Sequence, residues 1–479
     1  MEKKSDKKRR FLGHEKEGSK KYDSKIRGYF ELYESKFAVY RNNVSSQAWS
    51  YLQGLLFCEK GKANMERMEE QELGIAYHQY QHFLSNSPWS YEGVIKQVGQ
   101  DMSALLEKEK EKTGKPTGLI IDESSHIKKG KHSVGVARQY AGSVGKVDNC
   151  QVAVYVSLCN NKRSSLIDEA LFLPKEWTQD KERSQKSGIP ESKMSYKTKP
   201  ELALELIDKA IENEVVFDWV GGDGLYGHNY ELGKGLDERD LLFVLDIHKD
   251  QHIYEEAPVI FVGQKKRGRG RTPTQKKTLT KNIRVDKYAA GVAQKDWEVI
   301  KIRKTTKGWL KAKLHFKEVW VWDGKEEKAR KRILIIRKTL DKNNETADTK
   351  YSFSNGSLED YESEEFAFFQ AQRYWIERNF DDGKNELGMS DYQIRGWKSW
   401  HHHHAIVLMA MLFMLREQID QELEYPLMSL HDARKMVVVL IAQTIVKPPN
   451  PVNKEIERMK KRQAKRKKSI DWHFNNDST

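Results

Sequence analysis

The chain has 479 residues, of which 38% are hydrophobic and 32% are charged. This composition excludes a chain that is disordered overall and suits about two to four folded domains. Lys and Arg number 84 against 70 Asp and Glu, which gives a formal net charge of +14. A protein this basic is a candidate for binding a polyanion such as nucleic acid, although a merely basic surface gives the same count.

No segment of the sequence has the pattern of a membrane span or a secretory signal. The longest apolar runs, residues 405–415 and 436–442, are too short to cross a bilayer, and the basic N-terminus has no apolar stretch. The three cysteines have no metal-ligand spacing and suit a reducing compartment. We therefore expect a soluble cytoplasmic protein.

The first part of the chain changes from charged to helical. Residues 1–28 are dominated by Lys, Arg and Asp, which predicts a mobile basic arm. Residues 29–115 carry apolar side chains at helical spacing, and polar Lys, Arg, Asn and Gln are interspersed. This pattern is typical of a helix-turn-helix-like DNA reader and equally of an ordinary helical bundle, so no recognition helix is assigned.

The sequence of the middle of the chain predicts β-strands. TGLIID, CQVAVYVSL and VFDWVGGD are short β-branched runs, and a helical run at Glu201–Asn213 lies between them, which indicates an α/β layer. From His248 to Tyr361 the residues alternate as in a half-exposed antiparallel sheet, with a basic loop at Gly263–Lys277. Helical patterns return from Ser363. The expected segments are 1–28 (basic disordered arm), 29–115 (helical DNA-binding region), 116–247 (first part of the α/β core), 248–361 (β-rich insertion), 362–446 (second, helical part of the core) and 447–479 (basic tail).

Two acidic residues follow apolar strands. Asp122 ends the predicted strand at Gly118–Ile121, and Asp223 lies in the glycine-rich turn after residues 217–220. In α/β sheets the ends of such strands are where ligands bind. An aspartate at such a position, taken alone, is more often a turn or helix-cap residue. Assigning Asp122 and Asp223 to a functional site therefore requires a third acidic residue.

Glu377 is the candidate for that third group. At about 100° per residue, Arg373, Glu377 and Lys384 fall within roughly 40° of one another on a predicted helix, beside its apolar stripe. Charges at that edge carry a desolvation cost unless they are paired or used. A simple Arg373–Glu377 ion pair is the alternative, but it has the weaker order of base before acid and does not explain Lys384.

Three carboxylates on separate segments of a basic chain suit a metal site for phosphoryl transfer. Two divalent ions about 3.5–4 Å apart can activate the attacking oxygen and stabilise the leaving one. Hard oxygen ligands favour Mg²⁺, with Mn²⁺ as a substitute. We therefore expect Asp122, Asp223 and Glu377 to be both metal ligands and catalytic residues. His401–His404 enter an apolar helix, and we expect packing or a phosphate contact there ahead of metal binding.

Three blocks of the sequence resemble the DDE transposases of bacterial insertion sequences, in the branch with a β-rich insertion before the third acid. The first block, IIDESSHIKKGKHSVGVARQYAGSVGKVDNCQVAV, contains Asp122. The second, GGDGLYGHNYEL, contains Asp223 followed by the Tyr226-Gly227 pair. The third, RYWIERNFDDGKNELGMSDYQIRGWKSWHHH, contains Glu377. The sequence departs from the family at Gln370, where Tyr is frequent, and at Glu123, which follows the first acid where a second Asp is frequent and can stand in for Asp122.

The resemblance implies an RNase H-like catalytic core interrupted by an all-β insertion, with an N-terminal helical domain. It also implies two Mg²⁺ ions, double-stranded DNA as partner (the terminal inverted repeats and the target), and cleavage followed by strand transfer, in the cut-and-paste manner. Joining two ends to one target requires at least a dimer on DNA, which would associate with the nucleoid. The expected DNA-binding residues combine the basic loop after Asp122 with the later blocks: Lys128, Lys129, Lys131, His132, Arg138, Tyr226, Arg373 and Lys384.

Two other functions remain open at this stage. A metal-dependent nuclease would cut the DNA without joining it. A domesticated DNA-binding regulator would bind the repeats without any metal-dependent product.

Overall fold

The computed structural model describes residues 24–442 except 40–41, 72, 264–273, 306–307, 342–343 and 426, together with residues 460, 463–464 and 467–468. Most of the predicted arm, most of the basic tail and the centre of the loop Gly263–Lys277 lie outside these residues. Residues 24–34 are helical, so the last part of the predicted arm belongs to a helix. The cause is the spacing of Ile26, Phe30 and Tyr33, which are buried along one side of it. Within the described part of the chain, no helix is long and apolar enough to cross a membrane.

The chain forms two compact units. One draws on the described residues of Met1–Ser90, Lys384–Gln393 and Arg416–Thr479, and the other contains Tyr91–Gly383 and Ile394–Leu415. The segment predicted as one helical region therefore contributes to both units, because its last helix belongs to the second.

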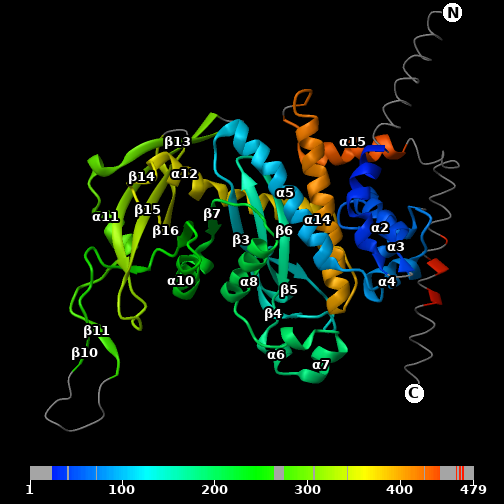
Figure 1. Ribbon diagram of the computed structural model, residues 1–479, viewed down its shortest axis with the longest axis horizontal. Helices are drawn as coiled ribbons and strands as arrows, with labels where there is room; N and C mark the ends of the chain where they lie inside the picture. Colours follow the sequence, from blue (N-terminus) through cyan, green and yellow to red (C-terminus); the bar gives the residue numbers. More distant parts are fainter. Residues whose placement is uncertain are drawn as a thin grey trace, which may run out of the picture. The chain divides into compact units, whose positions relative to one another are not determined.

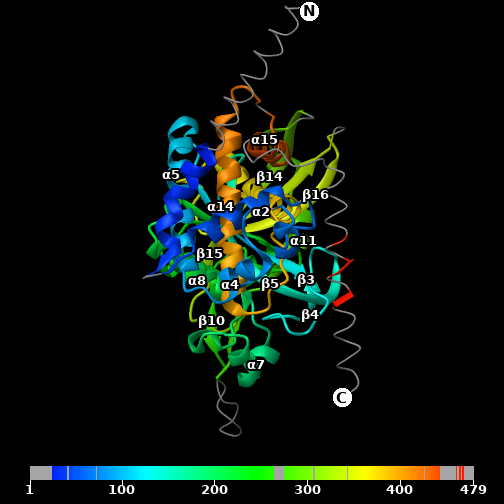
Figure 2. The same ribbon diagram turned by 90° about the vertical axis from the view of Figure 1, so that its right-hand side faces the viewer.

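The first unit is built from helices around an aromatic core (Figure 2, blue helices). The Trp89 ring stacks on Phe83 with centroids 5.3 Å apart and meets Phe37 edge-on at 5.1 Å. The Arg434 side chain ties the last helix to the carbonyl oxygens of Leu56 and Cys58. The named elements of this unit are η1 (Ser35–Phe37), β1 (Ala38–Val39), β2 (Asn42–Asn43), α2 (Ser45–Phe57), α3 (Met65–Glu69), α4 (Tyr77–Ser85) and α15 (Leu430–Ala442).

The second unit contains a ten-stranded mixed sheet in the order β13-β14-β15-β16-β8-β7-β3-β5-β4, with β6 also paired to β5 (Figure 1). The α/β prediction is therefore confirmed. The first strands are β3 (Gly118–Ile127), β4 (Ala137–Ala141), β5 (Lys146–Asn160), β6 (Arg163–Leu171), β7 (Trp219–Gly222) and β8 (Phe243–Ile247). Strand β5 is antiparallel to β3, and β6 is antiparallel to β5, so β6 runs in the direction of β3, as do β7 and β8.

Helices of the second unit cover both faces of the sheet. Helix α8 (Lys199–Glu212) starts at a capping box, in which Thr198 and Glu201 bind each other's backbone N–H. Its Lys209 binds Asp168 of β6 at 2.8 Å. The neighbouring residue Glu169 faces the other side and contacts α14. The remaining helices are α5 (Tyr91–Thr113), α6 (Lys175–Thr178), α7 (Lys181–Lys186), η2 (Glu191–Lys193), α9 (Gly224–Gly227), α10 (Tyr230–Glu238), α12 (Ser363–Gln372), and most of α13 (Tyr374–Glu386) and α14 (Trp397–Asp420), whose last residues are counted in the first unit.

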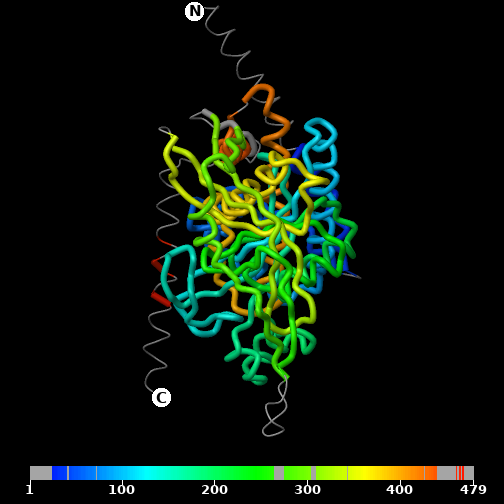
Figure 3. The backbone as a smooth tube through the Cα atoms, turned by 90° about the vertical axis from the view of Figure 1, so that its left-hand side faces the viewer, coloured from blue at the N-terminus to red at the C-terminus, as the bar shows by residue number. Residues whose placement is uncertain are grey.

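The segment 248–361 differs from the predicted all-β insertion in two ways. It includes helix α11 (Val285–Gly291) and the 3-10 turn η4 (Gln294–Asp296). Its long strands also extend the central sheet, since Tyr351–Ser354 of β16 pair with β8 (Figure 3, green to yellow). A separate β insertion and an extension of the central sheet have the same alternation of buried and exposed residues, so the sequence pattern did not distinguish the two. The strands are β9 (His252–Ile253), β10 (Ile260–Val262), β11 (Lys276–Thr278), β12 (Ile283–Arg284), β13 (Glu298–Thr305), β14 (Gly308–Val321), β15 (Arg330–Leu340) and β16 (Thr346–Ser354).

The four consecutive histidines His401–His404 at the start of α14 are all buried, with at most 5% of their surface exposed. Nδ1 of His404 donates to the carbonyl oxygen of Trp400 at 3.0 Å. Burial, followed by the neighbouring His403, lowers the pKa of His404 well below its usual 6.5. The four side chains are therefore part of the core, and burial favours the neutral imidazole of His404.

We expect acid to destabilise this core through His404. The unfolded chain takes up a proton near pH 6.5, whereas the folded chain resists it, so the free energy of unfolding falls as the pH drops below that value. The loss is up to about 1.4 kcal/mol per pH unit for one such group. Urea unfolding at pH 7.5 and 5.5 measures it. His404→Asn keeps a side-chain N–H donor without titrating in this range, and should lose less stability on acidification than wild type or the exposed control His132→Asn. An equal loss in all three proteins would contradict the assignment.

Candidate active site

The register of three parallel strands places three aspartates side by side. Ile121 of β3 pairs with Gly222 of β7, and Gly222 pairs with Leu245 of β8. The residues that follow these partners are Asp122, Asp223 and Asp246. Neighbouring strands lie about 4.8 Å apart, so successive carboxylates meet at this edge of the sheet. Strand β3 itself continues to Ile127, so Asp122 marks the end of its pairing with β7 and not, as predicted, the end of the strand.

Asp122, Glu123 and Asp223 form the group of carboxylates that can hold a metal ion. Their nearest oxygen atoms all lie within 4.8 Å of one another. Glu123 is fixed by two further partners: the Lys199 ammonium at 2.8 Å and the Tyr226 hydroxyl, which donates to it at 3.0 Å. Asp223 also caps α9 by accepting from the Leu225 N–H at 2.9 Å. Asp223 therefore both caps a helix, which the sequence offered as one interpretation, and belongs to the group of carboxylates.

The electrostatics of this group favour a bound cation. Burial and the neighbouring Asp223 raise the pKa of Asp122 to about 8, against the opposing effect of Arg373. Burial and Glu123 raise the pKa of Asp223 as well. Close carboxylates resist full ionisation unless positive charge joins them. Carboxylate oxygens are hard ligands, and a divalent ion such as Mg²⁺ would supply the positive charge that they require.

Arg373 connects the remaining acids to this group. Its guanidinium lies 2.8 Å from Glu377, 3.1 Å from Asp246 and 3.7 Å from Asp122. Glu377 keeps half of its side chain exposed and is joined to the other acids through Arg373. The predicted single helix is broken here, because Arg373 caps α12 before α13 begins at Tyr374. Lys384 lies two turns after Glu377 on α13.

Asp246 was not selected from the sequence. Its carboxylate accepts from the Ser352 hydroxyl at 2.6 Å, and that hydroxyl accepts from the Gln370 amide at 2.6 Å. Gln370 is buried and occupies the position where the family often has Tyr, so here its amide supports an acid of the sheet. The signal was present in LLFVLDIH, which has the same order of apolar strand and acid that selected Asp122.

Two residues of the block GGDGLYG have structural roles. Tyr226 is fully buried and donates to Glu123, which leaves no exposed surface for the DNA contact expected from the sequence. Gly227 lies against β8, where a Cβ atom would collide with the carbonyl oxygen of Asp246. Only glycine permits this close approach, which keeps α9 next to the carboxylates.

The basic residues expected to bind DNA follow β3. Lys128 is half-buried, whereas Lys129, Lys131, His132 and Arg138 are exposed. The structure adds further cations, because a hollow beside this loop is lined by Lys131, His132, Arg183, Lys186 and Arg395. The guanidinium of Arg183 lies over the Trp177 ring at 3.7 Å and donates to the carbonyl oxygen of Lys131 at 2.9 Å. Three of these cations come from later segments, so sequence spacing did not group them with the loop.

Comparison with known proteins fits this geometry. The profile of the family described as DDE superfamily endonuclease matches residues 39–309, more than half of the chain. The chain belongs to this family. A probable transposase for insertion sequence element IS701 from Microchaete diplosiphon is 33% identical over 178 residues, which cover 36% of this chain and 41% of that protein. The chain thus matches less than half of the length of this curated relative.

The family match covers only part of the candidate site. Asp122, Glu123, Asp223 and Asp246 lie inside residues 39–309, whereas Arg373 and Glu377 lie beyond them. Membership in the DDE superfamily implies use of a divalent metal, and the group of three carboxylates can hold one. Glu377, expected from the sequence to be the third acid, is linked to this group through the ion pairs of Arg373.

Proposed function

We propose that this protein is a DNA transposase that cleaves the ends of an insertion sequence and transfers the 3′-hydroxyl into target DNA by cut-and-paste. The observation that carries the proposal is the gathering of Asp122, Glu123 and Asp223 at one sheet edge, with Glu377 joined to it through Arg373. The strand order β6-β5-β3-β7-β8 supports an RNase H-like core for this chemistry.

The residues of the chain have distinct tasks in this proposal. Asp122, Glu123 and Asp223 would hold Mg²⁺ or Mn²⁺, which when bound supplies activation of the attacking oxygen and stabilisation of the leaving oxygen. Glu377 would complete the set for the second of the two ions. Arg373 orients Glu377 at 2.8 Å and limits the repulsion among the acids. Lys199 and Tyr226 fix Glu123, so the carboxylate oxygens are positioned before DNA arrives.

The basic surface beside the carboxylates would hold the DNA backbone. Lys129, Lys131 and His132 are exposed on the loop between β3 and β4, and Arg183 and Arg395 face the adjacent hollow. Such contacts fix the position of the scissile phosphate without reading sequence. Because two ends must join one target, the proposed active form is at least a dimer on DNA.

A strand-transfer assay with the full chain tests the proposal. Pre-cleaved DNA and, in parallel, uncut DNA that carry the element ends are incubated with supercoiled target DNA and Mg²⁺ or Mn²⁺, and EDTA is the control. We expect joined products that require the metal. Cleavage of uncut ends without joining would favour a nuclease, and binding of the ends without any product would favour the inactive regulator.

A further inference from the structure

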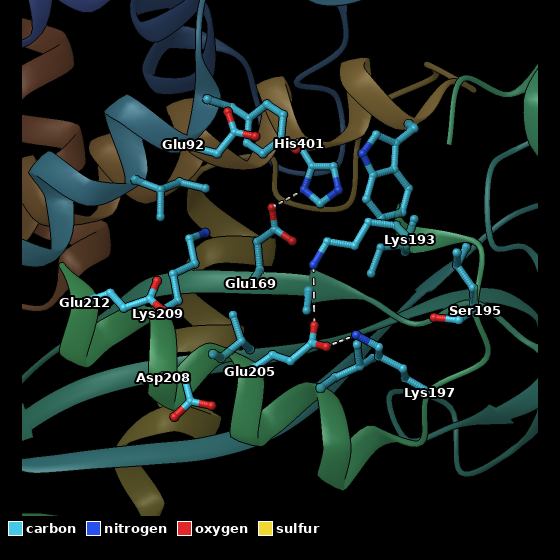
Figure 4. A pocket seen from close by; sticks show the side chains of 18 residues that line it. Glu92, Glu169, Lys193, Ser195, Lys197, Glu205, Asp208, Lys209, Glu212 and His401 are labelled. Atoms are coloured by element: carbon cyan, nitrogen blue, oxygen red, sulfur yellow. Dashed lines mark hydrogen bonds and ion pairs between the residues drawn. The ribbon is translucent and has the colours of Figure 1, made fainter. Parts of the chain in front are cut away.

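A separate cavity of about 400 Å³ lies at the edge of the sheet formed by β6 (Figure 4). Its walls come from β6, α5, α8 and the start of α14, and from the segment 193–197, where Lys193 and Ser195 are exposed to solvent. The cavity is therefore accessible from outside. Apolar side chains make up much of its surface: Ile95, Leu171, Leu173, Leu202, Leu206 and Trp397.

The cavity is distinct from the metal-binding carboxylates. Glu169 on β6 pairs in register with Tyr155 on β5, which pairs with Asp122 on β3. The two sites thus lie two strands apart in one row of the sheet, about 10 Å by the usual strand spacing.

Three buried polar atoms of the cavity make no hydrogen bond within the described protein: Oε2 of Glu169, Nε2 of His401 and the indole Nε1 of Trp397. Glu169 and His401 are at least nine-tenths buried, with exposures of 4% and 5%. Their other atoms bind each other, because Nδ1 of His401 lies 2.7 Å from Oε1 of Glu169. Figure 4 shows the second carboxylate oxygen of Glu169 directed into the cavity. A buried oxygen of this kind costs about 1–3 kcal/mol unless something donates to it.

The proton between the two residues determines what such a group must be. When the proton between them is on Nδ1 of His401 or Oε1 of Glu169 and Oε2 carries none, Oε2 of Glu169 is an acceptor. A ligand then presents an N–H or O–H donor at this point. Nε2 of His401 accepts when the neutral imidazole has its proton on Nδ1, and donates when that proton is on Nε2.

The charges around the cavity favour a positively charged donor. Its lysines are already engaged: Lys193 and Lys197 bind Glu205, and Lys209 binds Asp168 at 2.8 Å. Asp208 is likewise bound by Arg239 from outside the cavity. The lining carboxylates outnumber the lysines: Glu92, Glu169, Glu205, Asp208 and Glu212.

We propose that this cavity binds a small organic cation of the amine or guanidine class with an apolar stem. Its N–H group donates to Oε2 of Glu169, and its stem packs against Leu202, Leu206 and Trp397. This site goes beyond the proposed DNA chemistry and does not depend on it.

Calorimetric titration of the full chain, without DNA, tests the site. The probes are putrescine, agmatine and butylamine, with butanol and butyrate as four-carbon neutral and anionic controls. We expect binding of at least one cation and none of butanol or butyrate. Glu169→Gln, which removes the charge but keeps the shape, should weaken binding by about tenfold or more, in line with a charge-assisted hydrogen bond.

A second variant tests the cavity without changing Glu169, in case Glu169→Gln does not fold. Leu206→Trp fills the cavity and leaves Glu169 in place, and it should also abolish binding, whereas Glu182→Gln on the exposed surface should bind as wild type does. Circular dichroism and the urea midpoint verify that each variant is folded. If none of the cations binds wild type, or if they bind folded Glu169→Gln and Leu206→Trp as tightly as wild type, the proposal is overturned.

Discussion

Asp122→Asn is expected to lower metal-dependent cleavage of element-end DNA by about 10³-fold, the upper range for removing one preorganised charge at a reaction centre. The physical reason is that Asp122 both belongs to the group that can hold a metal ion and contacts Arg373. One of its oxygens lies within 4.8 Å of an oxygen of Glu123 and of Asp223, and Arg373 approaches it at 3.7 Å. Asn keeps the shape of the side chain but cannot supply the negative charge. Gel assays of cleavage and of end binding measure both effects, and binding should persist.

Parallel variants determine which acids take part. Glu377→Ala should also abolish cleavage with end binding retained, whereas Asp250→Asn, an exposed acid after β8, should cleave as wild type does. Glu123→Gln separates the two adjacent acids. If Asp122→Asn remained active and Glu123→Gln did not, Glu123 would be the first acid and Asp122 its neighbour.

Asp246→Asn is expected to reduce cleavage by about 10- to 100-fold, as removal of a residue that orients a reacting group typically does. Asp246 binds Arg373 at 3.1 Å, and Arg373 in turn holds Glu377 at 2.8 Å. Loss of the Asp246 charge frees the guanidinium, so Glu377 loses its fixed position. We expect kcat to fall while KM for end DNA changes little, because Asp246 has only 14% of its side chain exposed.

Ser352→Ala provides a graded comparison for this role. It removes the hydroxyl that donates to Asp246 at 2.6 Å and leaves the carboxylate charge in place. Its defect should therefore be smaller than that of Asp246→Asn, with the same split between kcat and KM. Full activity of Asp246→Asn would exclude the positioning role. A loss as large as that of Asp122→Asn, together with weaker Mn²⁺ binding, would instead make Asp246 a metal ligand.

The sequence by itself determined the local elements and part of the site. The run Gly118–Ile121 predicted a strand, and β3 begins at Gly118; the helical run at Glu201–Asn213 corresponds to α8. Such predictions succeed because periodicity records which side chains face a core. The same local logic selected Asp122 and Asp223, and it would also have selected Asp246 had it been applied to every apolar strand that meets an acid.

The tertiary structure decided how these pieces meet. The register between β3, β7 and β8 brings Asp246 beside the other acids, and pairing of β16 with β8 turns a predicted separate layer into an extension of the sheet. Glu169 and His401, which are 232 positions apart, form one buried pair. The spacing of residues along the chain does not predict these arrangements, because strand register and cavity walls depend on contacts between segments that are distant in the sequence.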